Sequence, residues 1–152
     1  MRIVIDTNIA FSAILNTNSL FARIILHPKS RLHFYSTDLL SIEIEEHKDK
    51  LQRLSGFNDP ELTKSISLII SRIRFIDVNL IPSSVLLNSQ KLLENVDIDD
   101  TEFVALATHI HGRLWSGDKL LQNGLIKKGW NKFISTHELY QLIDKKRIPF
   151  VL

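Results

Sequence analysis

The first residues of the chain constrain its fold most, because a run of β-branched residues there ends in an acid. Residues 3–5 are Ile, Val and Ile, a pattern typical of a short strand that is buried on both faces at the centre of a parallel sheet. Asp6 follows at once. A carboxylate rarely lies beside such a strand unless it is paired or binds a cation. Either one of residues 6–8 caps a helix that begins at Ile9, or Asp6 belongs to an acidic site.

Length and composition predict an ordinary globular protein. The chain has 152 residues, of which 44% are hydrophobic and 24% charged, and we expect a single domain over residues 1–152. The absence of cysteine excludes disulfides, thiolate zinc sites and cysteine nucleophiles. We see neither a long apolar run nor a signal peptide, so we expect a cytoplasmic protein without a membrane span. A net charge of +2 permits an anionic partner without requiring one.

Apolar periodicity and turn residues predict strands that alternate with helices. We expect strands at 2–5, 32–35, 74–78, 114–116 and 133–135. We expect helices at 9–15, from 20 to a stop at 27–28, from a cap at Ser36 or Thr37 to a break at Gly56, and at 60–73, 82–96, 99–109, 118–127 and 136–145. This order predicts an α/β fold, a three-layer α/β/α sandwich around a mainly parallel five-stranded sheet. The apolar tail at 148–152 should pack somewhere on the protein, and ligands should bind at the carboxyl ends of the strands.

Glu43 lies at the margin of an apolar helical stripe. Helical angles form that stripe from Leu40, Ile44, His47, Leu51 and Leu54. Glu43 is therefore the acid of this helix that we expect to be partly buried. The alternative is a boundary glutamate whose stem carries its carboxylate to solvent.

Asp100 falls inside an apolar arc in the first turn of the helix over 99–109. That arc consists of Phe103, Val104, Ala107 and Ile110. Asp99 lies three residues before Glu102 and resembles the cap of a capping box. We therefore expect a structural role for Asp99 and a chemical role for Asp100, with the helix N-terminus offsetting part of the negative charge.

Asp118 follows the strand at 114–116 and Gly117, which permits a tight turn. It is either a turn or cap residue or a fourth acid at the same edge of the sheet as Asp6. Carboxylates that converge at one edge repel one another unless a cation lies between them. Ligation by oxygen alone indicates Mg²⁺ or Mn²⁺ rather than zinc, and the six histidines show no metal-binding spacing.

These features together resemble the PIN-domain family. The resemblance covers nearly the whole chain, and it rests on the strand that ends in Asp6-Thr7-Asn8, the helical Glu43, the helix from Asp100 to Ala107 and the turn from Ser116 to Leu121. It implies a PIN-like sheet and a metal-dependent ribonuclease. Many stand-alone members of this size are toxins of toxin-antitoxin modules.

The resemblance assigns a role to each matching residue. It places Asp6, Glu43, Asp100 and Asp118 at the acidic, metal-binding positions, Asn8 at the polar position and Ser116 at the hydroxyl position. Asp97 or Asp99 is a candidate outer ligand. The implied partners are RNA and an antitoxin, and the apolar helices are compatible with a homodimer.

Several alternatives stay open. Lys119, Lys127, Lys128 and Lys132 are candidates to hold RNA, or they form a solvated face. Trp115 and Trp130 either stack on bases or pack in the core. Two other functions compete with the ribonuclease: a non-catalytic RNA- or protein-binding module, and a metal-dependent phosphatase. Against the phosphatase, the chain has no phosphate-binding GxxxxGK[ST] loop and no Asp-x-Asp motif after the first strand.

Overall fold

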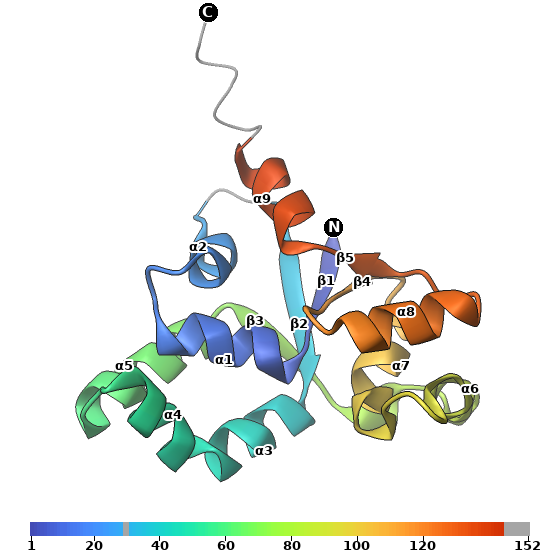
Figure 1. The fold of residues 1–152 in the computed structure, drawn as a ribbon, viewed down its shortest axis with the longest axis horizontal. Coiled ribbons are helices and arrows are strands. Elements are labelled where there is room, and N and C mark those ends of the chain that lie inside the picture. The colour runs from blue at the N-terminus through green and yellow to red at the C-terminus, as the bar shows by residue number, and fades with distance from the viewer. Residues whose placement is uncertain (29–30, 145–152) are drawn as a thin grey trace, which may run out of the picture.

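In the computed structural model, which describes residues 1–28 and 31–144, one five-stranded sheet runs through the molecule (Figure 1). Every strand pair is parallel, and the strand order is β3-β2-β1-β4-β5. The strands are β1 (Arg2–Ile5), β2 (His33–Thr37), β3 (Ile73–Ile76), β4 (Arg113–Trp115) and β5 (Phe133–Ile134). The predicted α/β fold with β1 at its centre is therefore confirmed. The end of the last predicted helix, residue 145, and the apolar tail at 148–152 lie outside the described residues.

Helices cover both faces of the sheet and give the three predicted layers (Figure 1). One face carries α1 (Thr7–Leu15), α2 (Leu20–Leu26), α3 (Asp38–Glu46), α4 (Lys48–Ser55), α5 (Asp59–Ile70) and α9 (Thr136–Asp144). The other face carries α6 (Ser83–Leu93), α7 (Thr101–His109) and α8 (Lys119–Lys127). Two 3₁₀ turns, η1 (Val78–Leu80) and η2 (Ile98–Asp100), precede α6 and α7.

The alternation of side chains along β1 fills two separate cores. Ile3 and Ile5 belong to the apolar cluster under α1, and Val4 belongs to the cluster under α7. All three side chains are fully buried. A strand needs apolar residues on both faces when each face is covered by helices, which explains why residues 3–5 are uninterrupted β-branched residues.

The helix predicted to run from residue 36 or 37 to Gly56 is two helices. α3 ends at Glu46 and α4 begins at Lys48, because the backbone of His47 leaves the helical conformation. The His47 ring bonds the Glu43 carbonyl at 2.9 Å and contacts the Phe11 ring. The predicted apolar stripe therefore ends early, and Leu54 is 59% exposed.

The end of α7 is fastened to the beginning of β1. The Arg2 guanidinium donates a hydrogen bond to the Ile110 carbonyl at 2.8 Å. His111, with φ 54°, takes a left-handed conformation after the end of α7. The next residue, Gly112, is required by close packing, because a Cβ added there would lie 2.8 Å from the Arg2 carbonyl oxygen. The position tolerates only a residue without a side chain because backbone approaches backbone.

Among the described residues, no single helix is both long enough and apolar enough to cross a membrane. Only α1 and α2 taken together reach that length and composition, and they meet at a bend of 100°.

We predict that Gly112→Ala destabilises the protein by about 2 kcal/mol, the usual range for forcing an extra group into a packed interior. The new methyl group would push apart the Arg2 backbone and the end of α7. Thermal or urea unfolding measures the change. Gly117→Ala is the matched control, because a Cβ there meets nothing within 4 Å. Equal stability of the two variants would contradict the close approach at Gly112.

Candidate metal centre

The strand order predicts a crevice at the carboxyl ends of β1 and β4. From β1 the chain proceeds to β2 and β3 on one side, and later returns to β4 and β5 on the other. Open α/β sheets bind ligands where the strand order reverses in this way. Asp6 ends β1, and Asp118 follows β4 after a short turn. Asp100 immediately precedes α7, which contacts both strands.

Asp6 is both a helix cap and a buried acid. Its side chain is 4% exposed, and its Oδ1 accepts a hydrogen bond from the Ile9 backbone N–H at 3.0 Å. Burial raises the pKa of Asp6 to about 6, although hydrogen bonds from Ile9 and Ser116 lower it; the charges of Asp118 and Glu43 raise it further. The two interpretations of Asp6 left open by the sequence are therefore compatible.

Ser116 connects Asp6 to Asp118. Its hydroxyl oxygen accepts a hydrogen bond from the Asp118 backbone N–H at 3.1 Å, and its side chain also bonds Asp6. Its carbonyl accepts a hydrogen bond from the Gln122 side chain at 2.8 Å. Asp118 itself caps α8, with its Oδ1 3.1 Å from the Leu121 nitrogen. These bonds fix the turn that carries Asp118 relative to the end of β1.

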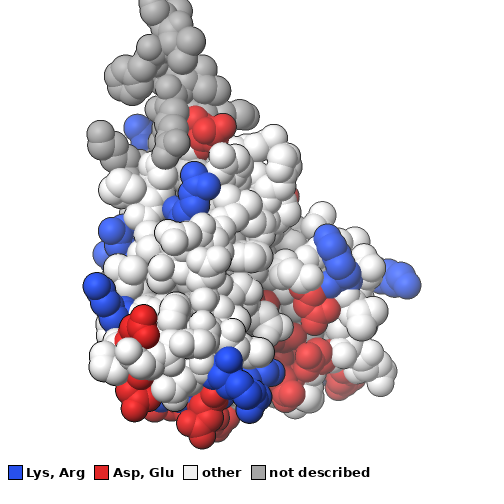
Figure 2. Space-filling model, turned by 60° about the vertical axis from the view of Figure 1, so that its left-hand side comes forward, with Lys and Arg blue, Asp and Glu red and all other residues white. Residues whose placement is uncertain are grey.

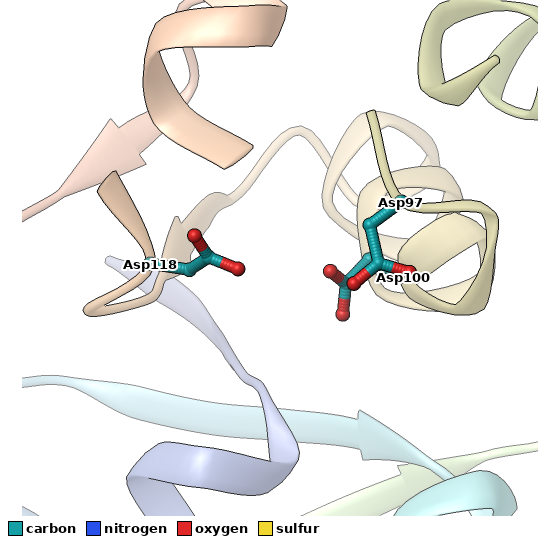
Figure 3. A group of neighbouring side chains, drawn as sticks. All are labelled: Asp97, Asp100 and Asp118. Carbon is teal, nitrogen blue, oxygen red and sulfur yellow. The ribbon is translucent and has the colours of Figure 1, made fainter. Parts of the chain in front are cut away.

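Asp100 lies in a group of three carboxylates with Asp97 and Asp118. One oxygen from each lies within 4.8 Å of the others. Figure 3 shows Asp97 and Asp100 side by side, with the Asp118 carboxylate directed toward them. Burial raises the pKa of Asp100 to about 7, with further increases from the charge of Asp97 and then those of Asp6 and Asp118.

The beginning of α7 differs from the prediction. The helix begins at Thr101 with Asp100 as its N-cap residue, and the 3₁₀ turn η2 precedes it. Asp99 is exposed, so the predicted capping box with Glu102 is wrong. Asp97 caps η2 instead, because its Oδ1 accepts the Asp99 N–H at 3.1 Å. The η2 turn thus holds Asp97 and Asp100 on the same side, three residues apart.

Glu43 and Asn8 lie further from the three carboxylates. Glu43 is half-buried on α3 and close enough to Asp6 for its charge to raise the pKa of Asp6. It lines an open pocket of about 440 Å³ between α3 and the start of α7; the other lining residues are Leu39, Glu46, His47, Ile98, Asp99, Thr101 and Glu102. Asn8 is exposed, and among the described residues its side chain makes no hydrogen bond to the acids.

The two tryptophans are core residues. Trp115 is fully buried, stacks on Phe21 and donates a hydrogen bond to the Thr136 hydroxyl. Trp130 is 7% exposed and donates to the Thr108 hydroxyl. Neither ring face is open to a base, so stacking on RNA is excluded for both in this structure.

The four candidate lysines have different surroundings. The Lys128 ammonium donates two hydrogen bonds of 2.7 Å, to the carbonyls of Leu92 and Glu94, and so closes the end of α6. Lys119 and Lys127 are exposed and Lys132 is half-buried. Figure 2 shows acidic side chains gathered at the lower end of the molecule, the end toward which β2 points in Figure 1, with Lys and Arg side chains beside them.

The donor set fits a hard divalent cation. The crevice offers carboxylate oxygens, which Mg²⁺ and Mn²⁺ prefer. No Lys or Arg among the described residues forms an ion pair with Asp6, Asp97, Asp100 or Asp118. In addition, the buried hydroxyls of Thr7 and Thr37 have no hydrogen-bond partner among the described residues. A cation would relieve the repulsion that raises the pKa values of Asp6 and Asp100.

Comparison with known families agrees with this geometry. The sequence model of the PIN domain matches residues 4–140, which include every acid described above. No curated protein sequence matches the chain.

We predict that Asp100→Asn raises the stability of the metal-free protein above that of the wild type, and that this gain is larger at pH 8 than at pH 5. In the folded chain Asp100 keeps its proton up to about pH 7, whereas its ordinary pKa is 3.8. Between pH 3.8 and about pH 7 the folded state therefore binds more protons than the unfolded state. The wild type loses stability as the pH rises through this range. Asparagine does not titrate, so the variant avoids this loss. Melting temperatures in EDTA at both pH values measure the difference.

Asp99→Asn is the matched control, because Asp99 lies on the same turn and is exposed. We expect its effect on the melting temperature to be the same at both pH values. If the increase in melting temperature caused by Asp100→Asn were the same at both pH values, this result would contradict the raised pKa of Asp100.

Proposed function

The chain belongs to the PIN-domain family, and from this premise we propose that it is a metal-dependent endoribonuclease. Proteins of this family are usually nucleases that require a divalent metal. The observation that carries the proposal is the convergence of Asp97, Asp100 and Asp118 at the carboxyl edge of the sheet, beside the buried Asp6. We take residues 1–152 as one nuclease domain.

Each acid has a role in this proposal, and that of Asp97 is an outer ligand beside Asp100. Asp6, Asp100 and Asp118 hold one or two Mg²⁺ or Mn²⁺ ions, and Glu43 completes the ligand set or orients water. A bound divalent cation lowers the pKa of its water and stabilises charge on the attacked phosphate. Ser116 keeps the Asp6 carboxylate in place through its hydrogen bond. Asn8, exposed at the first turn of α1, is available to hydrogen-bond a phosphate.

The acidic edge repels phosphate, so cationic side chains at its margin must hold the RNA. We propose Lys119 for this role, because it is exposed in the first turn of α8, next to the capping residue Asp118, whereas Lys127 is exposed at the other end of that helix. Lys128 is a poorer candidate than the sequence indicated, since its ammonium is bound to backbone carbonyls.

The biological setting that we propose is a toxin-antitoxin module. A toxin of this kind acts on cellular RNA in the cytoplasm and is inhibited by a protein that covers its acidic edge. We further propose that the chain forms a homodimer. These proposals rest on the family resemblance and on the exposure of the acidic edge.

Cleavage of a labelled single-stranded RNA tests the enzymatic proposal. We predict cleavage with Mg²⁺ or Mn²⁺, none with EDTA, and a loss of at least about 100-fold in Asp100→Asn, because a missing metal ligand removes transition-state stabilisation. Asp99→Asn should retain nearly full activity.

Three results would contradict this proposal. Equal cleavage by wild type and Asp100→Asn would indicate a contaminating nuclease. RNA binding without cleavage across a varied panel of sequences would favour the binding module. Release of phosphate from small esters through an aspartyl-phosphate would favour the phosphatase.

Purification from the native host tests the toxin proposal. We predict that a small protein co-purifies with the chain and suppresses its nuclease activity, and that removing this protein under denaturing conditions, followed by refolding, restores cleavage. Full activity of the native complex would contradict the inhibitory partner.

A further inference from the structure

Three neighbouring strands end in polar residues that form one row across the sheet. The register pairs Val4 with Tyr35 and Ile5 with Trp115. Two residues beyond the pair of Val4 and Tyr35, the same register places Thr37 beside Asp6. One residue beyond the pair of Ile5 and Trp115, it places Ser116 on the other side of Asp6. The Ser36 hydroxyl donates to the Ile5 carbonyl at 3.0 Å, which shows that β1 and β2 are still adjacent at this point.

The row faces α7. Side chains alternate between the two faces of a strand, and Val4, Tyr35 and Leu114 all pack in the cluster beneath α7. Thr37, Asp6 and Ser116 lie two residues further along their strands, so they fall on the same face. Asp100 precedes the first residue of α7, and after burial and the charge of Asp97, the charge of Asp6 raises its pKa, so the two carboxylates are close.

Thr37 is the unexplained member of the row. Its side chain is fully buried, and its hydroxyl has no hydrogen-bond partner among the described residues. Although Thr37 is the N-cap residue of α3, it makes no side-chain cap bond. A buried hydroxyl without a partner destabilises the folded state and is uncommon, which suggests that it has a partner in another state of the protein.

The Asp6 carboxylate is the hydrogen-bond acceptor that lies beside Thr37 in this row. An ionised carboxylate has about four acceptor sites. The Ile9 N–H and the Ser116 hydroxyl use two of them. One further site serves a metal ion, and one is left for another donor. Carboxylates that ligate metals are usually hydrogen-bonded by such outer groups, which orient them.

We propose that Thr37 is a positioning residue for Asp6: when Asp6 ligates the cation, the Thr37 hydroxyl donates a hydrogen bond to its carboxylate from the strand opposite Ser116. The inference rests on the metal centre of the proposed function. Thr37 and Asp6 are side by side on adjacent strands, which lie about 4.8 Å apart.

Mn²⁺ titration followed by thermal unfolding tests the proposal without reference to nuclease activity. In metal-free protein, Thr37→Val should leave the melting temperature unchanged or raise it, because it removes an unpartnered hydroxyl. The Mn²⁺ concentration that gives half of the maximal stabilisation should rise about 10-fold, as is typical when an outer-shell partner is lost. Thr37→Ser keeps the hydroxyl and should restore the wild-type midpoint.

Ser36→Ala is the matched control, since Ser36 is also buried at the end of β2 but already has a partner. It should show the opposite pattern: a lower metal-free melting temperature and an unchanged Mn²⁺ midpoint.

Two outcomes would overturn the inference, and they are distinguishable. If Mn²⁺ stabilises wild type and Thr37→Val with the same midpoint, Thr37 does not position Asp6, although the metal centre stands. If Mn²⁺ does not stabilise the wild type, the metal centre and the proposed function fall together with the inference.

Discussion

The burial of a carboxylate at the end of the central strand is the constraint on which the rest of this structure depends. Asp6 is held by the first turn of α1 and by Ser116, and both bonds favour its charged form. Burial and the neighbouring acids oppose that form more strongly, so the pKa of Asp6 remains high. The fold thus keeps an acid in a place where a proton or a bound cation relieves the cost of its buried charge. Such local instability is common where a protein carries out chemistry.

The sequence was sufficient to predict the sheet, because its signals are local and redundant. Residues 3–5 identify a strand that is covered on both faces, and the alternation of strands with helices then leaves few topologies. The break at His47 could not be predicted in this way. The apolar spacing on its two sides resembles one continuous helix, and the contact of His47 with Phe11 joins residues that are far apart in the chain.

The candidate site was accessible from the sequence only as a set of acids. Asp6, Asp100 and Asp118 each follow or precede an element at the same edge, and this much can be derived from topology. The pairing of Asp97 with Asp100 requires the η2 turn, where the sequence instead suggested a capping box at Asp99. The relation of Thr37 to Asp6 requires the strand register, which no pattern of single residues encodes. Sequence thus identifies the chemistry of a site more readily than its supporting contacts.

The fastening of α7 to β1 has a mechanical consequence for the crevice. The contact of Gly112 with Arg2, and the hydrogen bond from Arg2 to Ile110, join the helix and the strand at the end remote from the acids. Asp6 and Asp100 lie at the other ends of these same two elements, about 14 Å away for a nine-residue helix. Between these two ends, α7 packs against β1, β2 and β4, so the distance from its first turn to the end of β1 is set along the whole length of the helix. The distance between Asp6 and Asp100 therefore depends on how the whole helix packs on the sheet and not only on the acids themselves.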